Sequence, residues 1–283
     1  MQKRERTARL ARQMNGFFSL LSEVVGFRNK LKFCAYVLSS ARRRANRIGS
    51  SERLVEFKHA RVYFGVGAGE LRSYIEVFLE DDYDIAKISR QYSGGVVVDV
   101  GANIGIFSLA ASQNFQNAEI YALEPHPDAY SRLVENLKLN QADNVRPLNR
   151  AVCSMSGPVR LSAGASTTAG SVCDAGNLSI EGVSLDDLCA ERAIDHVGLL
   201  KIDVEGGEVE VLKGAGKTLE NTDWVVVECH STELAQMVDE RLMGKGFRKA
   251  SERRVPAGGG MLRFCKSKQG QRAESALDTA SGL

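Results

Sequence analysis

The stretch VVVDVGANIG, from Val96 to Gly105, constrains the fold more than any other segment of the chain. An apolar run of strand length ends at Asp99, Gly101 and Gly105 enclose a short turn, and helix-forming residues follow from Ile106 onward. In a parallel α/β protein such a turn holds a nucleotide-like ligand, because glycines let the backbone approach the ligand and the helix N-terminus faces it. The alternative is an ordinary strand–turn–helix unit that binds nothing.

The spacing of the glycines argues against one common ligand class. A dinucleotide-binding turn has glycine at relative positions 1, 3 and 6, which here are occupied by Gly101, Asn103 and Ile106. The acid at the strand tip instead favours a cationic ligand, and S-adenosylmethionine, with its ammonium and sulfonium groups, is such a ligand. We therefore predict cofactor contacts from Asp99, Gly101, Asn103 and Gly105, with the Asn103 amide hydrogen-bonded to the methionine moiety.

A second acid stands at the end of the next expected strand. Residues 118–123 are mostly apolar and are expected to form a strand, and Glu124 follows directly after them. Because the carboxyl ends of parallel strands meet at one edge of a sheet, Glu124 and Asp99 are expected at the same edge. A carboxylate there can accept hydrogen bonds from both hydroxyls of an adenosine ribose. We predict this role for Glu124; the alternative is a solvated turn acid.

Three further motifs complete the pattern. They are the acid–proline pair Glu124-Pro125, the stretch LLKIDVEGGEVEVLKGA at residues 199–215, and the segment Glu228-Cys229-His230. Together with DVGANIG at residues 99–105, they make the chain resemble the FkbM-type methyltransferases over about residues 70–250. The resemblance implies a class I methyltransferase fold, S-adenosylmethionine as the methyl donor and usually a hydroxyl oxygen as the acceptor. It does not imply a particular acceptor.

Strand and helix patterns alternate through this region. They predict an α/β domain of parallel strands joined by right-handed crossovers. The resemblance implies the rest of the architecture: a Rossmann-like class I methyltransferase fold, with a seven-stranded, mostly parallel sheet and helices on both faces. The expected strands are 96–100, 118–123, 144–149, 198–203 and 223–229; the expected helices are 82–92, 104–115, 127–140, 207–220 and 231–244, after a hairpin at 53–66. Residues 154–182, rich in Ser, Gly, Ala and Thr, are expected to be the least structured internal stretch, serving either as part of the acceptor mouth or as a surface loop.

The ends of the later strands supply candidate catalytic residues. The strand order is expected to reverse between 96–100 and 198–203, which places the ligands above that crevice. Asp203 and Glu205 follow the second of these strands and His230 follows the next one, so each can act as a base or as an anchor for the acceptor. Glu205 can alternatively cap the helix that follows it. A divalent metal held by Asp203 and Glu205 is an alternative, as in some oxygen methyltransferases, but two carboxylates alone are weak grounds for it, and no metal is predicted.

The expected adenine contact departs from the family pattern. Ala151 follows the strand 144–149, at the position where adenine is expected to lie, and is predicted as a cofactor contact. Arg150 stands where class I methyltransferases commonly have an acid. A backbone contact to adenine is therefore expected.

Positive charge is concentrated at the start of the chain. Residues 1–50 contain 12 Lys and Arg but two acidic residues, while the whole chain has a formal charge of +2, so the remainder is acidic. Apolar residues recur there at helical spacing, which predicts a basic amphipathic helical extension over residues 1–52, ahead of a methyltransferase domain at 53–266 and a disordered tail at 267–283. The extension either lies on an anionic membrane or a partner protein, or packs as a cap on the domain.

The cysteine, histidine and basic residues argue against several classes of protein. Six cysteines are scattered without a C-x-x-C pair or clustered histidines, which argues against a zinc site and a disulfide framework and favours a reducing, cytoplasmic location, with peripheral membrane attachment as an option. Nucleic-acid binding is not favoured, because no aromatic-rich basic motif accompanies the charge. The acceptor is expected to be a small molecule, a sugar or other glycan, or a lipid-linked group. The alternatives are an RNA or protein methyltransferase that uses the basic segment, a nicotinamide dehydrogenase, and a non-catalytic cofactor-binding protein attached to a membrane.

Overall fold

The structure, a computed structural model, describes residues 20–31, 33–34, 53–64, 68–162, 171–172, 178–254 and 258–266. Its centre is a seven-stranded sheet. In spatial order the strands are β12 (Phe247–Arg254), β13 (Gly260–Lys266), β11 (Thr222–Cys229), β10 (Val197–Ile202), β3 (Val96–Val100), β4 (Ile120–Leu123) and β5 (Val145–Leu148). The strands from β5 to β11 are parallel, and β13 is antiparallel to both of its neighbours. The predicted seven-stranded, mostly parallel sheet is confirmed.

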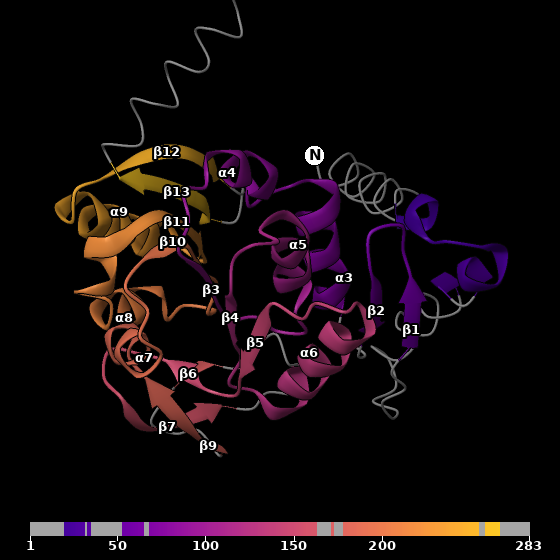
Figure 1. The fold of residues 1–283 in the computed structure, drawn as a ribbon, viewed down its shortest axis with the longest axis horizontal. Helices are drawn as coiled ribbons and strands as arrows, with labels where there is room; N and C mark the ends of the chain where they lie inside the picture. The colour runs from indigo at the N-terminus through magenta and orange to yellow at the C-terminus, as the bar shows by residue number, and fades with distance from the viewer. Residues whose placement is uncertain are drawn as a thin grey trace, which may run out of the picture.

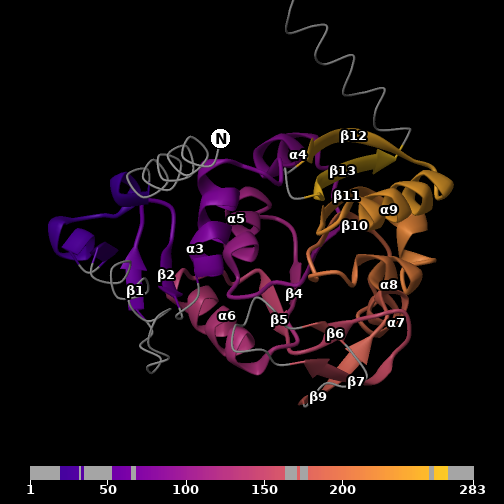
Figure 2. The ribbon, with the colours of Figure 1, turned by 180° about the vertical axis from the view of Figure 1, so that it is seen from behind.

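Helices cover both faces of this sheet, as predicted (Figures 1 and 2). Successive strand residues point to opposite faces, so Val97 packs in the core on one face and Val98 and Val100 pack in the core on the other. The first core contains residues of α5 (Ile106–Asn114) and α6 (Pro127–Leu139). The second contains residues of α7 (Leu185–Glu191), α8 (Glu208–Lys213) and α9 (Thr232–Gly244).

One helix is shorter than its sequence pattern predicts. A continuous helix was expected over 207–220, but α8 ends at Lys213 and a separate 3₁₀ turn, η2 (Thr218–Asn221), follows. Gly214 and Gly216 separate the two segments, and glycine has low helix propensity. A Cβ at Gly214 would also clash with the Cys153 carbonyl oxygen, so glycine lets this turn pack against the loop after β6.

A second, smaller sheet contains most of the described part of residues 154–182, where little regular structure was expected, and several of these residues line the pocket described below. Its strands, in spatial order, are β6 (Ala151–Val152), β9 (Leu178–Val183), β7 (Gly157–Ser162) and β8 (Ser171–Val172). Val159, Leu161, Leu178 and Ile180 pack with Ala151 in a separate apolar cluster. The described part of 154–182 is therefore largely strand, because apolar residues alternate with Arg160, Ser179 and Glu181 and fit a half-buried sheet.

The N-terminal segment contacts the domain. The strands β1 (Arg53–Glu56) and β2 (Arg61–Phe64) form the predicted hairpin. Val24 forms an antiparallel bridge with Phe57, and Leu20, Val24 and Phe33 are buried in the core that contains α5. The described part of residues 1–50 thus packs on the domain. The rest of the predicted extension and the predicted tail at 267–283 lie outside the described residues.

Candidate active site

The strand order reverses between β3 and β10, as predicted. The chain continues from β3 to β4 on one side and from β10 to β11 on the other, so the two connections separate at the carboxyl ends of β3 and β10. A pocket of about 800 Å³ opens at this point, and ligands of α/β sheets bind at such a crevice. Its lining includes Gly101, Asn103, Glu124, Ala151, Asp203 and Glu205.

The turn after β3 forms the floor of the pocket. Gly101 has a φ of +77°, and a Cβ there would clash with the Asp203 carbonyl oxygen, so glycine lets the two strand ends lie against each other. Asn103 also adopts a left-handed backbone, with a φ of +50°, and lines the pocket. Gly105 is not among the lining residues. A Cβ at Gly105 would meet Leu133, so this glycine brings the turn close to α6.

The Asp99 side chain lies beneath the turn and is not among the pocket lining. It is completely buried, it accepts a hydrogen bond from the Ser108 hydroxyl at 2.6 Å, and it lies 3.0 Å from Lys201 Nζ. Lys201 also donates a hydrogen bond to the Gly101 carbonyl oxygen at 2.7 Å. Asp99 therefore supports the turn through a buried ion pair, where the sequence pattern predicts a direct cofactor contact.

Glu124 occupies the predicted place at the end of β4. It is buried, and its two carboxylate oxygens accept hydrogen bonds from the backbone N–H groups of Asn103 and His126, each at 2.8 Å. Burial raises the pKa of Glu124 to about 7, against the opposing effect of these two hydrogen bonds. The Asn149 amide donates hydrogen bonds to the carbonyl oxygens of Glu124 and Pro125, which fixes the chain between β4 and β6.

The region expected to contact adenine also lines the pocket. Ala151 and Arg150 are both lining residues. The Arg150 guanidinium lies 2.6 Å from a carboxylate oxygen of Glu181 and 2.6 Å from one of Glu191, so it joins β9 to α7. These ion pairs direct the Arg150 side chain toward Glu181 and Glu191.

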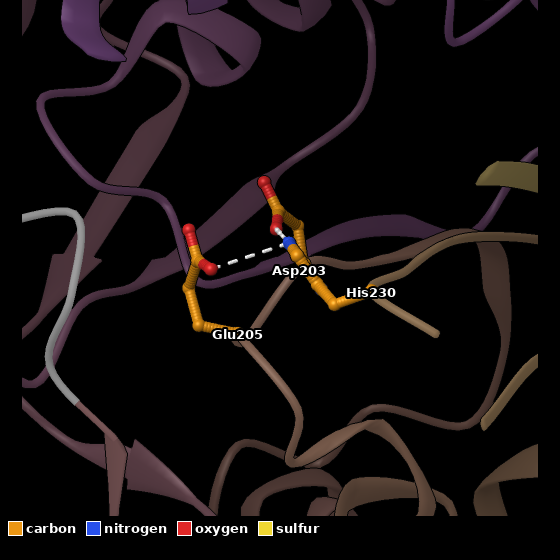
Figure 3. Close-up of side chains that lie close together, drawn as sticks. All are labelled: Asp203, Glu205 and His230. Carbon is orange, nitrogen blue, oxygen red and sulfur yellow. Dashed lines mark ion pairs between the residues drawn. The ribbon is translucent and has the colours of Figure 1, made fainter. Parts of the chain in front are cut away.

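The three predicted catalytic residues come together although they follow different strands (Figure 3). His230 Nε2 lies 3.3 Å from Glu205 Oε2 and 3.9 Å from Asp203 Oδ1. Its other ring nitrogen, Nδ1, lies 2.9 Å from Glu208 Oε1 on the first turn of α8. The hydrogen bond to Glu208 raises the pKa of His230 to about 9, so that the ring is cationic at neutral pH.

Sequence reasoning missed a second row of ionisable residues behind Asp203. Glu228 accepts a hydrogen bond from the Tyr83 hydroxyl at 3.1 Å, and burial together with the charges of Asp203 and Glu76 raises the pKa of Glu228 to about 7. Glu76 lies in a π-helical turn, η1 (Ile75–Leu79), and is 2.6 Å from Arg72 Nε. The motif Glu228-Cys229-His230 could have indicated Glu228 as a site residue. Glu76 and Tyr83 precede the repeating strand–helix pattern, and no sequence motif marked them as site residues.

A sheet of this order, with a glycine turn after β3 and a buried acid at the end of β4, is a Rossmann-like α/β fold of the class I methyltransferase type. The family model described as the methyltransferase FkbM domain matches residues 99–249. That is more than half of the chain, and the chain belongs to this family of methyltransferases.

Three named relatives are similar to the chain. Hexuronic acid methyltransferase AglP of Haloferax volcanii is 34% identical over 48% of this chain and 56% of its own length. Methyltransferase sdnD of Sordaria araneosa is 30% identical over 62% of this chain and 80% of its own. The 31-O-demethyl-FK506 methyltransferase FkbM of Streptomyces tacrolimicus is 31% identical over 66% of this chain and 85% of its own. The match to the first of these relatives thus spans little more than half of that protein.

Proposed function

We propose that this protein transfers the methyl group of S-adenosylmethionine to a hydroxyl oxygen of a small-molecule or glycan acceptor. One observation carries the proposal: a single pocket is lined by Glu124, suited to a ribose and placed after β4, and by Asp203 and Glu205, which follow β10 on the other side of β3. Cofactor and acceptor would thus be held side by side. The name of FkbM, a 31-O-demethyl-FK506 methyltransferase, supports an oxygen acceptor, and the name of AglP, a hexuronic acid methyltransferase, supports a sugar acid as an acceptor class.

The residues of the pocket fit the proposed cofactor. Asn103 Oδ1 is buried and has no hydrogen-bond partner among the described residues, so this oxygen is available to the ammonium group of the methionine moiety. Glu124 has two buried oxygens beside the pocket and would accept hydrogen bonds from the ribose hydroxyls. Ala151 lies along the wall, where its backbone would contact the adenine ring. These assignments rest on donor and acceptor chemistry at each position.

The acceptor side has to align an oxygen and remove its proton. When bound, the sulfonium cofactor supplies a methyl group already activated for in-line displacement, in which the carbon–sulfur electron pair returns to sulfur. Asp203 and Glu205 line the pocket there and would hold the acceptor hydroxyl and take up its proton. His230, cationic at neutral pH, would keep both carboxylates oriented.

Replacement of Glu124 by alanine tests the cofactor side. The loss of two ribose hydrogen bonds from a buried site is expected to weaken S-adenosylmethionine binding by about 1–3 kcal/mol. Isothermal titration calorimetry measures this change, and NAD is expected not to bind the unchanged protein. Affinity equal to that of the unchanged protein would remove Glu124 from the cofactor site.

The same carboxyl makes the affinity depend on pH, and Glu124→Gln is the matched control. With a pKa of about 7, Glu124 is largely protonated below that pH and ionised above it. Because ribose hydroxyls donate to the ionised form, affinity should rise by up to about tenfold as the pH increases from about 6 to about 8. Glutamine has nearly the same shape as glutamate but does not titrate. The pH profile of the glutamine variant therefore shows how far ionisation of S-adenosylmethionine itself changes the affinity. Parallel profiles for the two proteins would contradict the assignment.

We further propose that the N-terminal segment attaches the protein to an anionic membrane surface. No described helix is long and apolar enough to cross a bilayer. Val25, Phe27 and Leu31 are nevertheless exposed, with Phe27 at 77%, and Arg28 beside them is exposed as well. Exposed apolar side chains next to basic ones suit the interface of an anionic bilayer.

Cosedimentation with liposomes tests this attachment. The full chain is expected to pellet with vesicles that contain phosphatidylserine and not with purely zwitterionic vesicles, and the bound fraction should fall as salt rises. Phe27→Ser combined with Leu31→Ser should reduce pelleting while S-adenosylmethionine binding is kept. These exposed positions are preferable to a truncation, because Leu20, Val24 and Phe33 are buried in the core. Equal pelleting of the double variant would contradict the proposal and leave a protein partner or a capping role for the segment.

A further inference from the structure

The cluster formed by Asp203, Glu205 and His230, called here the Asp–Glu–His cluster, has the composition and size of a metal-binding site. Each side chain offers one ligand atom, and these atoms all lie within 4.8 Å of one another. Figure 3 shows the two carboxylates and the imidazole directed toward a common point from the loops after β10 and β11. Carboxylate oxygens together with one imidazole nitrogen are a ligand set for divalent first-row cations.

A second, independent feature is the residue behind the imidazole. Glu208 is completely buried, and its Oε1 lies 2.9 Å from His230 Nδ1, on the side of the ring away from the cluster. This contact fixes the ring so that Nε2 is directed at Asp203 and Glu205. A histidine held by a carboxylate on one nitrogen, with the other left for a cation, is the common arrangement around bound metals. Glu208 Oε2, also buried, has no hydrogen-bond partner among the described residues.

The nearby cationic side chains are committed to other carboxylates. Lys201 lies 3.0 Å from Asp99, closer than its 3.8 Å distance to Asp203. Arg72 lies 2.6 Å from Glu76. Glu228 adds another carboxylate behind the cluster. A bound cation would displace the Nε2 proton of His230 and take its place between the two carboxylates.

The cluster leaves room for further ligands. Asp203 and Glu205 line the pocket, and their side chains are 26% and 46% exposed, while His230 is 31% exposed. A cation held there by three protein atoms would keep coordination positions open toward the pocket, as in catalytic metal sites. An acceptor hydroxyl could occupy one of them, which would lower its pKa beside the methyl donor.

We propose that Asp203, Glu205 and His230 bind one divalent cation of the Mn²⁺ class, with Glu208 as the positioning residue for His230, and that this cation receives the acceptor oxygen. The second part rests on the proposed methyl transfer. The cation site itself does not, because it is formed by side chains of the free protein.

Titration of the full chain with Mn²⁺, followed by the electron paramagnetic resonance signal of free Mn²⁺, tests the site without turnover. We expect one Mn²⁺ per chain. Asp203→Asn and His230→Ala should each remove this binding, and Glu208→Gln should weaken it by about 10- to 100-fold, as substitutions behind a metal-bound histidine do. Glu210→Gln is the matched control, because Glu210 also lines the pocket but pairs with Lys213 outside the cluster. Its Mn²⁺ affinity should equal that of the unchanged protein.

Two results would overturn the proposal. The first is weak Mn²⁺ binding that is the same in all variants, which would indicate adventitious association with surface carboxylates. The second is no binding at all, in which case the cluster is an ion pair between His230 and its two carboxylates. Calorimetry with S-adenosylmethionine on the same samples separates these outcomes from failure of the methyltransferase proposal. Retained cofactor binding without Mn²⁺ binding would reject the cation site alone.

Discussion

Replacement of Lys201 by methionine is expected to destabilise the protein by about 3–5 kcal/mol. Lys201 is buried and is 3.0 Å from Asp99, which is buried as well. Removal of one partner leaves the other charge without compensation in an environment that solvates it poorly, and this is the costly way to break a buried ion pair. Urea denaturation followed by circular dichroism measures the change as a shift of the transition midpoint.

The double variant Asp99→Asn/Lys201→Met is the control for this prediction. The single variant Lys201→Met and the double variant both lose the hydrogen bond from Lys201 to the Gly101 carbonyl oxygen. The difference between their free energies of unfolding therefore reports the cost of the charge left on Asp99. Asparagine retains an oxygen that can accept from Ser108, whose hydroxyl lies 2.6 Å from Asp99. The double variant should therefore be more stable than Lys201→Met alone. Equal stability of the two would attribute the loss to packing and to the hydrogen bond.

Asp203→Asn is expected to lower the rate of methyl transfer by about 10²–10⁴-fold while S-adenosylmethionine affinity is kept. Asparagine preserves the size of the side chain, and the backbone hydrogen bond from Asp203 N–H to the Val100 carbonyl oxygen remains. It cannot accept a proton from the acceptor and carries no charge. Single-turnover experiments at saturating cofactor measure the chemical step, and calorimetry measures cofactor affinity.

The turnover measurement needs the acceptor. Mass spectrometry of metabolites and lipids from cells with and without the gene should reveal pairs that differ by the mass of one methylene group, and the lighter member is the acceptor. A variant that loses cofactor affinity but keeps its rate at saturation would contradict the division of the pocket into a Glu124 side and an Asp203 side. Thermal denaturation of the same sample shows whether the variant is folded.

The sequence was informative wherever a feature depends on residues close together in the chain. Strand β3, the glycine turn and Glu124 follow from an apolar run, two glycines and the spacing to the next strand. The role of Asp99 depends on strand pairing, because Asp99 and Lys201 face each other across β3 and β10. Alternation along β3 places Asp99 on the same face as Val97, toward one core and away from the pocket. Without the pairing register of β3 and β10, the sequence does not identify Lys201 as the partner of Asp99.

Other features were hidden for different physical reasons. The stretch 154–182 resembles a loop in composition because Ser, Gly, Ala and Thr are frequent in it, and only the apolar alternation within β7 and β9, buried against Ala151, indicates strands. The grouping of His230 with Asp203 follows from the adjacency of β10 and β11, and was expected in outline from their parallel order. Glu76 reaches the same region from a π-helical turn, a conformation with no simple sequence signature.

The position of Lys201 has a consequence for attempts to change the acceptor. This one amine lies 3.0 Å from Asp99 beneath the cofactor turn and 3.8 Å from Asp203 on the acceptor side. Substitutions of Lys201 itself would therefore disturb the cofactor turn and the acceptor side together, and the two halves of the pocket are joined through this side chain. The strand β7 forms another wall of the same pocket through residues such as Pro158 and Val159, away from this ion pair. Libraries aimed at new acceptors should vary that wall and leave the strand tips intact.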